Sequence, residues 1–225
     1  MKLSVVIPVY NEKATIHTII ERVKAAPFEK ELVIVDDGST DGTREYLSSL
    51  QDPEIRLILH PANRGKGAAV RTGIDASTGG MLVIQDADLE YSPDDYPALL
   101  APIVSGNADV VYGSRFLGVH RVFMFWHYTA NRTLTFITNV LYNTMLTDME
   151  TCYKAFRGDV IRALPLRSDG FDIEPEITAK VFKRSLRVYE IPITYHGRGY
   201  DEGKKITWRD AIWALVALVR FRFTD

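Results

Sequence analysis

Five short apolar runs, separated by segments long enough to form helices, constrain the fold of this chain more than any other feature. The runs are LSVVIPVY (3–10), ELVIVDDG (31–38), IRLILH (55–60), MLVIQDAD (81–88) and ADVVYGSR (108–115). Apolar runs of this length are typical of buried strands, and their alternation with helices predicts a mostly parallel sheet with helices on both faces. We therefore expect an α/β fold.

Polar residues follow most of these predicted strands. They are Asn11 and Glu12, then Asp36 and Asp37, then Asp86 to Glu90, and finally Ser114 and Arg115. In open parallel sheets ligands bind beyond the carboxyl ends of the strands. The sequence therefore predicts a binding site at that edge.

The pattern changes after Arg115. Two segments, 121–146 and 208–223, have helical spacing and combine aromatic with basic residues, as interfacial helices do. Packing onto the sheet, or onto a second copy in a homodimer, is the alternative. No repeat or linker interrupts the chain, so we expect one domain over 1–225.

Composition narrows the class of protein. A formal net charge of -2 argues against a broad surface for nucleic acid. The single cysteine, Cys152, cannot form an internal disulfide, which fits a reducing, cytoplasmic compartment. No apolar stretch reaches the roughly 20 residues of a spanning helix, and the run near the N-terminus is too short for a signal-peptide core. We expect any contact with a membrane to be peripheral.

The stretch DADLE places three carboxylates on alternate positions where a strand opens into a loop. Side chains two residues apart share a face, so Asp86, Asp88 and Glu90 can converge on one point. Carboxylate oxygens suit Mg²⁺ or Mn²⁺, to which a diphosphate adds further oxygens. A solvated acidic loop, with Asp88 or Ser92 capping the next helix, is the alternative.

Two glycine-containing stretches also follow strands. In VDDGSTDGT (35–43) the glycines, Ser39, Thr40 and Asp41 suit a tight turn into a helix, which leaves Asp37 to accept hydrogen bonds from a nucleotide base or ribose. In NRGKGAAVRTG (63–73) the glycines around Lys66 would let backbone N–H groups and an ammonium approach a phosphate. A helix cap with a solvated lysine explains that spacing equally well.

Together these stretches resemble the family-2, inverting GT-A glycosyltransferases, and particularly the dolichol-phosphate mannose synthase-like branch. The motifs in the family's order are VIPVYNE, VDDGSTDGT, NRGKGAAVRTG, DADLEYSP, GSR, TDMETCYKAFR and EIPITYHGRGYDEGKK. The resemblance implies a GT-A, Rossmann-like, three-layer sandwich with additional C-terminal helices. It also implies hexosyl transfer from a nucleotide-diphospho-sugar to a polyprenyl or dolichyl phosphate. Within the one domain it implies a nucleotide-sugar-binding half at about 1–115 and an acceptor- and membrane-facing half at about 116–225.

The resemblance assigns roles to individual residues. Those that would bind the donor are Pro8, Tyr10, Glu12, Val35, Asp37, Lys66, Asp86, Ala87, Asp88, Arg115, Arg198 and Lys204. Asp86 and Asp88, with Glu90 as a further candidate, would hold Mg²⁺ or Mn²⁺. Arg115 would lie between the donor and acceptor phosphates, Arg132 is a second candidate for the acceptor phosphate, and Asp88 and Arg115 are the candidate catalytic residues.

The chemistry depends on the acceptor. A lipid phosphate is already anionic near neutral pH and needs no general base, whereas a hydroxyl acceptor must lose a proton as it attacks. The acids that could line an acceptor site are Asp148, Glu150, Asp172, Glu174 and Glu176. Helix capping or core hydrogen bonding is the favoured interpretation of Asp172 and Glu176, while Asp148 and Glu150 stay open.

The function predicted from the sequence is therefore a metal-dependent polyprenyl-phosphate hexosyltransferase, peripheral at the cytoplasmic face of a membrane. A transferase that uses a saccharide or other hydroxyl acceptor is the first alternative, and a non-catalytic nucleotide-sugar-binding subunit is the second. No residue decides between GDP-mannose and UDP-glucose as donor, or whether a membrane-anchoring partner is needed.

Overall fold

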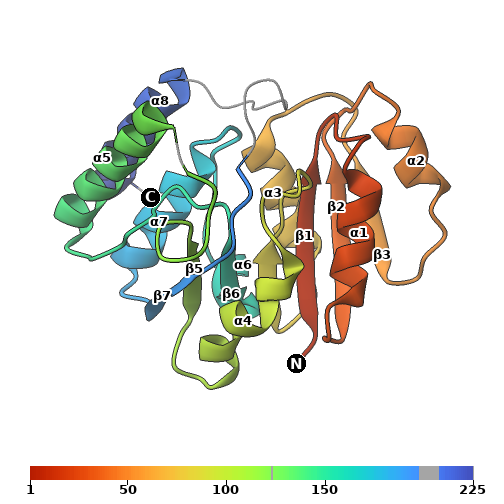
Figure 1. The fold of residues 1–225 in the computed structure, drawn as a ribbon, viewed down its shortest axis with the longest axis horizontal. Coiled ribbons are helices and arrows are strands. Elements are labelled where there is room, and N and C mark those ends of the chain that lie inside the picture. The colour runs from red at the N-terminus through yellow and green to blue at the C-terminus, as the bar shows by residue number, and fades with distance from the viewer. Residues whose placement is uncertain (123, 198–207, 225) are drawn as a thin grey trace.

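A seven-stranded, mostly parallel sheet forms the centre of the protein (Figure 1). The computed structural model describes residues 1–122, 124–197 and 208–224. The strands are β1 (Leu3–Val9), β2 (Lys30–Asp36), β3 (Ile55–Leu59), β4 (Met81–Ile84), β5 (Val110–Ser114), β6 (Lys154–Arg157) and β7 (Val188–Pro192). The helices are α1 (Ile16–Ala25), α2 (Thr43–Ser49), α3 (Lys66–Ala76), η1 (Pro93–Asp95), α4 (Tyr96–Val104), α5 (Phe125–Tyr142), α6 (Gly158–Arg162), α7 (Ile173–Lys183) and α8 (Trp208–Phe223).

The strand order is β3-β2-β1-β4-β6-β5-β7. β1 pairs in parallel with both β2 and β4, so the chain crosses over from β3 at one side to β4 on the other. This reversal of direction next to β1 is where open α/β sheets form a crevice for ligands. The α/β fold class and the five strands expected from the apolar runs are confirmed.

Two strands were not predicted from the sequence. β6 is four residues long and runs antiparallel between β4 and β5, while β7 extends the edge parallel to β5. Neither has the uninterrupted apolar run of the other strands, because β6 reads KAFR and β7 reads VYEIP. The insertion of β6 places a segment from the second half of the chain in the middle of the sheet.

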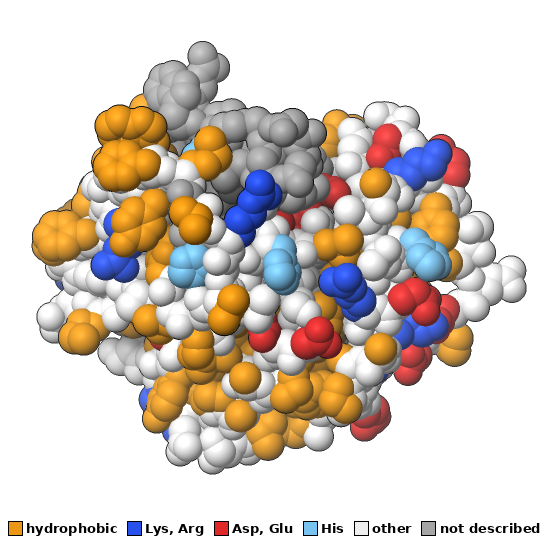
Figure 2. Space-filling view, in the orientation of Figure 1, with side chains coloured by type: hydrophobic (Ala, Val, Ile, Leu, Met, Phe, Trp, Pro, Cys, Tyr) orange, Lys and Arg blue, Asp and Glu red, His pale blue; other side chains and the backbone are white. Residues whose placement is uncertain are grey.

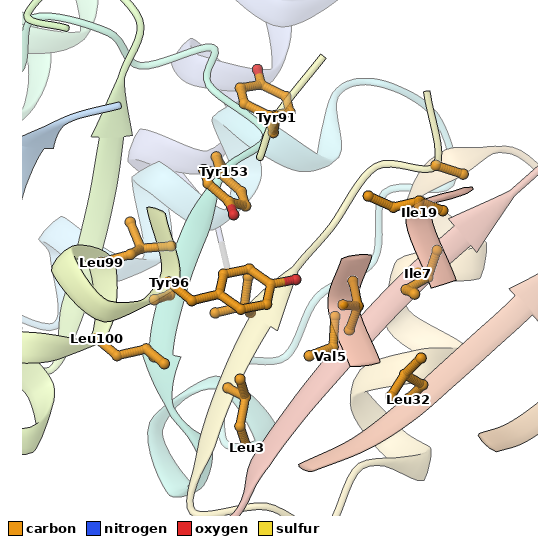
Figure 3. Packing of buried hydrophobic residues seen from close by; sticks show 14 of the residues in the cluster. Leu3, Val5, Ile7, Ile19, Leu32, Tyr91, Tyr96, Leu99, Leu100 and Tyr153 are labelled. Carbon is orange, nitrogen blue, oxygen red and sulfur yellow. The ribbon is translucent and has the colours of Figure 1, made fainter. Parts of the chain in front are cut away.

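Helices cover both faces of the sheet, which confirms the three-layer arrangement. Side chains alternate along β1, so that Leu3, Val5 and Ile7 pack with α1, α2 and α4 while Val6 packs with α3 and with the helices that follow β5. Figure 3 shows the first cluster, in which the ring of Tyr96 on α4 points toward the β1 side chains. Burial of each such side chain contributes about 1.5–3 kcal/mol.

Two helices from the second half of the chain, α5 and α8, pack side by side (Figure 1). The predicted helical segment 121–146 is realised as α5, which begins at Phe125 and ends at Tyr142, where Asn143 adopts a left-handed conformation with φ of 52°. Among the described residues, no helix is both long enough and apolar enough to span a bilayer.

Candidate active site

A cavity of about 920 Å³ opens beyond the carboxyl ends of the central strands. The predicted site residues that line it are Pro8, Tyr10, Glu12, Asp37, Lys66, Asp86, Ala87, Asp88, Glu90 and Arg115. Val35 is fully buried within β2 and does not line the cavity, and neither does Arg132. Arg198 and Lys204 lie outside the described residues.

The acidic stretch after β4 does not act as three equivalent carboxylates. Asp86 faces the ammonium of Lys66, with Nζ 2.7 Å from Oδ1 and 2.9 Å from Oδ2. Asp88 Oδ1 accepts a hydrogen bond of 3.1 Å from Glu90 N, and Leu89 between them has a φ of 65°. Glu90 Oε2 accepts a hydrogen bond of 2.9 Å from the Tyr195 hydroxyl. Each acid therefore has its own surroundings.

In the described part of the chain, no three His, Cys, Asp or Glu side chains form a group ready to hold a metal ion. Asp86 and Asp88 nevertheless line the same cavity and offer hard oxygen donors. Mg²⁺ commonly binds through one or two carboxylates together with substrate phosphates, rather than in a cage made by the protein alone. These two residues fit that kind of site, which a diphosphate would complete.

Lys66 is not a solvated lysine, which was the alternative interpretation of the glycine-containing stretch around it. Its ammonium lies 3.0 Å from Cys152 Sγ as well as beside Asp86, and its side chain is 14% exposed. Burial alone would lower the pKa of Lys66, but Asp86, Cys152 and Glu174 together outweigh burial and hold the pKa well above its usual value. The ammonium is therefore a fixed positive charge in the cavity wall.

The glycines around Lys66 serve the packing of its helix. Gly65 has a φ of +98°, and a Cβ there would lie 2.3 Å from the backbone oxygen of Asp169. A Cβ on Gly67 would lie 2.4 Å from the backbone oxygen of Ser168. Only glycine lets the 168–170 loop approach the start of α3 so closely.

Asp37 lines the cavity, but its carboxylate is already engaged by the protein. Its oxygens accept hydrogen bonds from the backbone N–H of Arg64 and Gly65, the latter at 2.8 Å, and Oδ1 lies 2.7 Å from His60 Nδ1. His60 Nε2 in turn lies 3.0 Å from Thr72 Oγ1. Asp37 therefore ties the loop before α3 to the end of β2, and sequence reasoning missed the contribution of His60.

Arg115, which directly follows β5, is held by a fully buried carboxylate. Its Nε and Nη2 each lie 2.7 Å from an oxygen of Asp148, and its backbone N–H donates to the same residue at 3.0 Å. Burial lowers and Asp148 raises the pKa of Arg115, and the net shift is well upward. Asp148, which the sequence left open, thus orients Arg115.

Aromatic rings border this arginine. The guanidinium of Arg115 lies 5.4 Å from the ring centroid of Tyr195 and 5.9 Å from that of Phe116. The guanidinium of Arg132 lies 5.8 Å from the same Phe116 centroid. Arg132 is exposed and donates to the backbone oxygen of Thr147 at 3.1 Å. Arg132 therefore lies near the Arg115 region without lining the cavity.

The other acids considered for an acceptor site differ in whether they line the cavity. Glu176 is fully buried and accepts hydrogen bonds from the backbone N–H of Arg167 and Ser168, and Asp172 accepts one from Gly170 N at the start of α7. These contacts confirm core hydrogen bonding for Glu176, whereas Asp172 stands at the N-cap of α7 but makes no side-chain cap hydrogen bond. Glu150, in contrast, lines the cavity, and burial raises its pKa to about 7.

The rim of the cavity continues onto an exposed apolar surface. Trp126 and Tyr128 of α5 line the cavity and are 77% and 42% exposed. Farther along α5, Phe136 and Val140 are exposed one turn apart. Figure 2 shows hydrophobic side chains gathered over α5, to one side of the acidic and histidine side chains at the centre of this face.

Residues 4–164 match the profile described as Glycosyl transferase family 2. The match covers most of the chain and includes every strand from β1 to β6. The chain belongs to glycosyl transferase family 2. Membership agrees with the family resemblance of the sequence motifs. Most residues that line the cavity fall within the matched range, while Phe171, Glu174, Tyr195 and Ala211 lie beyond it.

Relatives of this glycosyl transferase family 2 chain include proteins named for transfer to lipid phosphates. It is 30% identical over 214 residues to the dodecaprenyl-phosphate galacturonate synthase of Rhizobium johnstonii, covering 91% of this chain and 62% of the relative. It is 29% identical to the undecaprenyl-phosphate mannosyltransferase of Micrococcus luteus, covering 91% and 87%. It is also 29% identical to the dolichol-phosphate mannosyltransferase of Pyrococcus furiosus, covering 91% and 59%. The chain thus spans less than two thirds of the Rhizobium and Pyrococcus relatives.

Solved structures share the fold of this family 2 member. Glucosyl-3-phosphoglycerate synthase from Mycobacterium tuberculosis, in complex with Mn²⁺, uridine diphosphate and phosphoglyceric acid, superposes with a TM-score of 0.75. The two sequences are 21% identical, and the alignment covers 100% of this chain and 79% of that one. This likeness confirms the GT-A fold.

Proposed function

We propose that the protein transfers a hexose from a nucleotide-diphospho-sugar to a polyprenyl or dolichyl phosphate. The observation that carries the proposal is the presence of two carboxylates, Asp86 and Asp88, and one oriented guanidinium, Arg115, on the walls of the same cavity. Carboxylates attract a metal-bound diphosphate, and an arginine binds phosphate oxygens with defined geometry. The names of the relatives support a lipid phosphate as the acceptor.

The donor would lie along the edge of the sheet. Pro8, Tyr10 and Asp37 would contact its nucleotide, since they line the cavity beyond β1 and β2. Asp86 and Asp88 would hold Mg²⁺ or Mn²⁺ together with diphosphate oxygens, and the ion would offset the negative charge of the departing nucleotide. Lys66, paired with Asp86, adds a positive charge at the same point.

Arg115 would bring the two phosphates together. Asp148 occupies Nε and one N–H of Nη2, so the remaining N–H groups of the guanidinium are available to phosphate oxygens. An anionic acceptor oxygen then forms a bond to the anomeric carbon as the bond to the diphosphate breaks. Because the acceptor carries no proton to remove, alignment and charge compensation are the main tasks of the protein.

The acceptor's hydrocarbon chain would lie on the apolar surface beside the cavity. Exposed aromatic and aliphatic side chains on α5 and α8 would enter the interfacial region of a membrane, with Arg220 and Arg222 near its headgroups. Peripheral binding at the cytoplasmic face is part of this proposal. The same surface would serve in a homodimer or against a membrane-anchoring partner if lipid binding failed.

One observation favours a second candidate function. Glu150 has a pKa of about 7 through burial, which is the value that suits a general base near neutral pH. A saccharide or other hydroxyl acceptor would need such a base. Transfer to a soluble sugar, with none to lipid phosphate, would establish this second function.

The proposal is tested by incubating the protein with polyprenyl phosphate in detergent micelles, Mg²⁺ or Mn²⁺, and labelled GDP- and UDP-sugars. We expect a lipid-linked sugar with at least one donor, formed only when the metal is present. Absence of product with every donor, while donor binding is still measurable by calorimetry, would refute lipid-phosphate transfer.

A further inference from the structure

Three buried acceptor atoms without partners belong to residues that line the cavity. They are Oδ1 of Asn131 on α5, Oε1 of Glu150 in the loop before β6, and Oε1 of Glu174 in the first turn of α7. Each atom is closed off from solvent, and no described residue donates a hydrogen bond to it. Buried polar atoms are normally hydrogen-bonded, so three unpaired acceptors facing one cavity indicate a ligand with several donors.

The positive charges near these acceptors already have partners. Lys154 contacts Glu174 Oε2 and the backbone oxygens of Thr151 and Met149, which uses the three N–H groups of its ammonium. Lys66 is paired with Asp86, as described above. Glu150 forms no ion pair with a described residue, and its Oε1 accepts no hydrogen bond. The charges of Lys154 and Arg115 act on Glu150, but these two side chains are paired with Glu174 and Asp148.

We propose that Asn131, Glu150 and Glu174 form the hexose-binding end of the cavity and select a neutral sugar over a hexuronic acid. The proposal rests on the proposed function, because it assigns a place to the sugar of the donor. Hydroxyl groups of a hexose donate to all three oxygens, whereas the carboxylate of a uronic acid would meet the negative charge of Glu174 and, once it is ionised, that of Glu150.

The position of these residues agrees with the path of a donor. Glu150 lies two residues after Asp148, and Arg115 is among the charges that act on it. Glu174 acts on both Lys66 and Cys152. The three acceptors therefore adjoin the region where Lys66, Asp86 and Arg115 would hold the diphosphate, within reach of the sugar attached to it.

Water can meet unpaired buried acceptors, and a ligand gains affinity only when it reproduces the hydrogen bonds of the water that it displaces. A hexose reproduces them with its hydroxyl groups. Phe171, which lines the cavity just before α7, offers an apolar surface to the C–H groups of the ring.

The test compares donors with and without the sugar on the whole chain. Calorimetry with Mg²⁺ would measure the binding of UDP, GDP, UDP-glucose, UDP-galactose, GDP-mannose, UDP-glucuronate and UDP-galacturonate. A hydrogen bond to a charged group contributes about 1.5–3 kcal/mol, which corresponds to about 10- to 150-fold in affinity. We expect a neutral-hexose donor to bind at least about 10-fold more tightly than the uronate donor of the same nucleotide.

Two variants locate the effect. Glu150→Ala breaks no hydrogen bond to a described residue, and we expect it to weaken binding of the preferred donor about 10- to 100-fold while leaving the matching nucleoside diphosphate within about twofold. Glu174→Gln should also weaken binding of the preferred donor, although it also removes the charged partner of Lys154. Glu54→Gln, an exposed acid before β3, is the matched control and should change neither value.

Three results would overturn the proposal: preference for a uronate donor, an equal loss of donor and nucleoside diphosphate affinity in Glu150→Ala, or unchanged donor affinity in that variant. Unchanged affinity with lost transfer would instead identify Glu150 as a general base. Failure of the proposed function would give a different result: donors would bind with the expected preference, but no lipid-linked sugar would form.

Discussion

Arg115 and Asp148 form a two-bond pair in which Nε and Nη2 each lie 2.7 Å from a carboxylate oxygen. Asp148 is fully buried, and its own backbone N–H donates to Glu190 Oε1 at 3.0 Å. A chain of contacts thus runs from β7 through Asp148 to the guanidinium. The orientation of Arg115 is set by residues 33 and 75 positions away in sequence, and mutation at Asp148 should affect the site without touching a ligand.

We expect Asp148→Asn to lower kcat/KM for transfer by about 10²- to 10³-fold, since loss of orientation at a phosphate-binding group commonly costs this much. It should also reduce the free energy of unfolding by roughly 3–5 kcal/mol, because it leaves Arg115 buried without its counter-charge. Steady-state kinetics and denaturant unfolding measure the two effects.

The matched control is Asp109→Asn. Asp109 is buried and pairs with Arg157 and Arg187 at the opposite end of β5 from the cavity. This variant should lose stability and keep the transfer rate of the protein that remains folded. Equal kinetic losses in both variants would argue against an orienting role for Asp148.

Asp86 and Asp88 should differ in their effect on stability. Asp86→Asn leaves the buried ammonium of Lys66 without its partner, and we expect a loss of roughly 1–3 kcal/mol in the free energy of unfolding. Asp88→Asn keeps an oxygen for the hydrogen bond from Glu90 N, so its stability should change by less than about 0.5 kcal/mol. Both should nearly abolish transfer, and thermal unfolding beside a transfer assay distinguishes them.

Glu150 should make stability depend on pH. Burial raises the pKa of its carboxyl from 4.5 to about 7, so the folded protein holds a proton that the unfolded chain has released. Stability therefore falls as pH rises from about 4.5 to 7, by up to about 1–3 kcal/mol. Glu150→Gln should remove this part of the pH dependence, and urea titrations at pH 5 and pH 8 measure it. Identical pH profiles for the two proteins would contradict the expectation.

Gly67→Ala should loosen the junction of α3 with the 168–170 loop. The added Cβ would meet the backbone oxygen of Ser168 at 2.4 Å, and we expect a loss of about 2–3 kcal/mol in the free energy of unfolding. Gly106→Ala is the control, because its φ of +74° is strained for alanine but nothing lies within 4 Å. That change should cost only about 1 kcal/mol. Similar losses would mean that the close approach at Gly67 has little importance.

Membrane contact through α5 should respond to a charge on its exposed face. Phe136 is 67% exposed on α5, and Val104 is 61% exposed on α4. Phe136→Glu should reduce cosedimentation with vesicles that contain anionic lipid about 10-fold or more. It replaces a ring that would enter the membrane interface by a negative charge. Val104→Glu should have no effect, and equal binding by both variants would exclude this face as the membrane contact.

The sequence could predict the sheet because its apolar runs are local and long enough to be recognised. It could also predict the general location of the site, since carboxyl ends of parallel strands meet at one edge. β6 could not be found in this way, because KAFR is buried by pairing with β4 and β5 and not by a pattern of its own. The short strand is defined by its neighbours.

The sequence by itself determined the order of the first five strands, the family and most of the charged residues that line the cavity. Only the tertiary structure decided how those charges are paired: Asp86 with Lys66, Glu90 with Tyr195, and Arg115 with Asp148. It likewise decided that Asn131, Glu150 and Glu174, which line the same cavity, each keep one buried oxygen without a hydrogen bond. The physical reason is that pairing and burial depend on distances between segments that are remote along the chain, whereas motifs record only which groups are available.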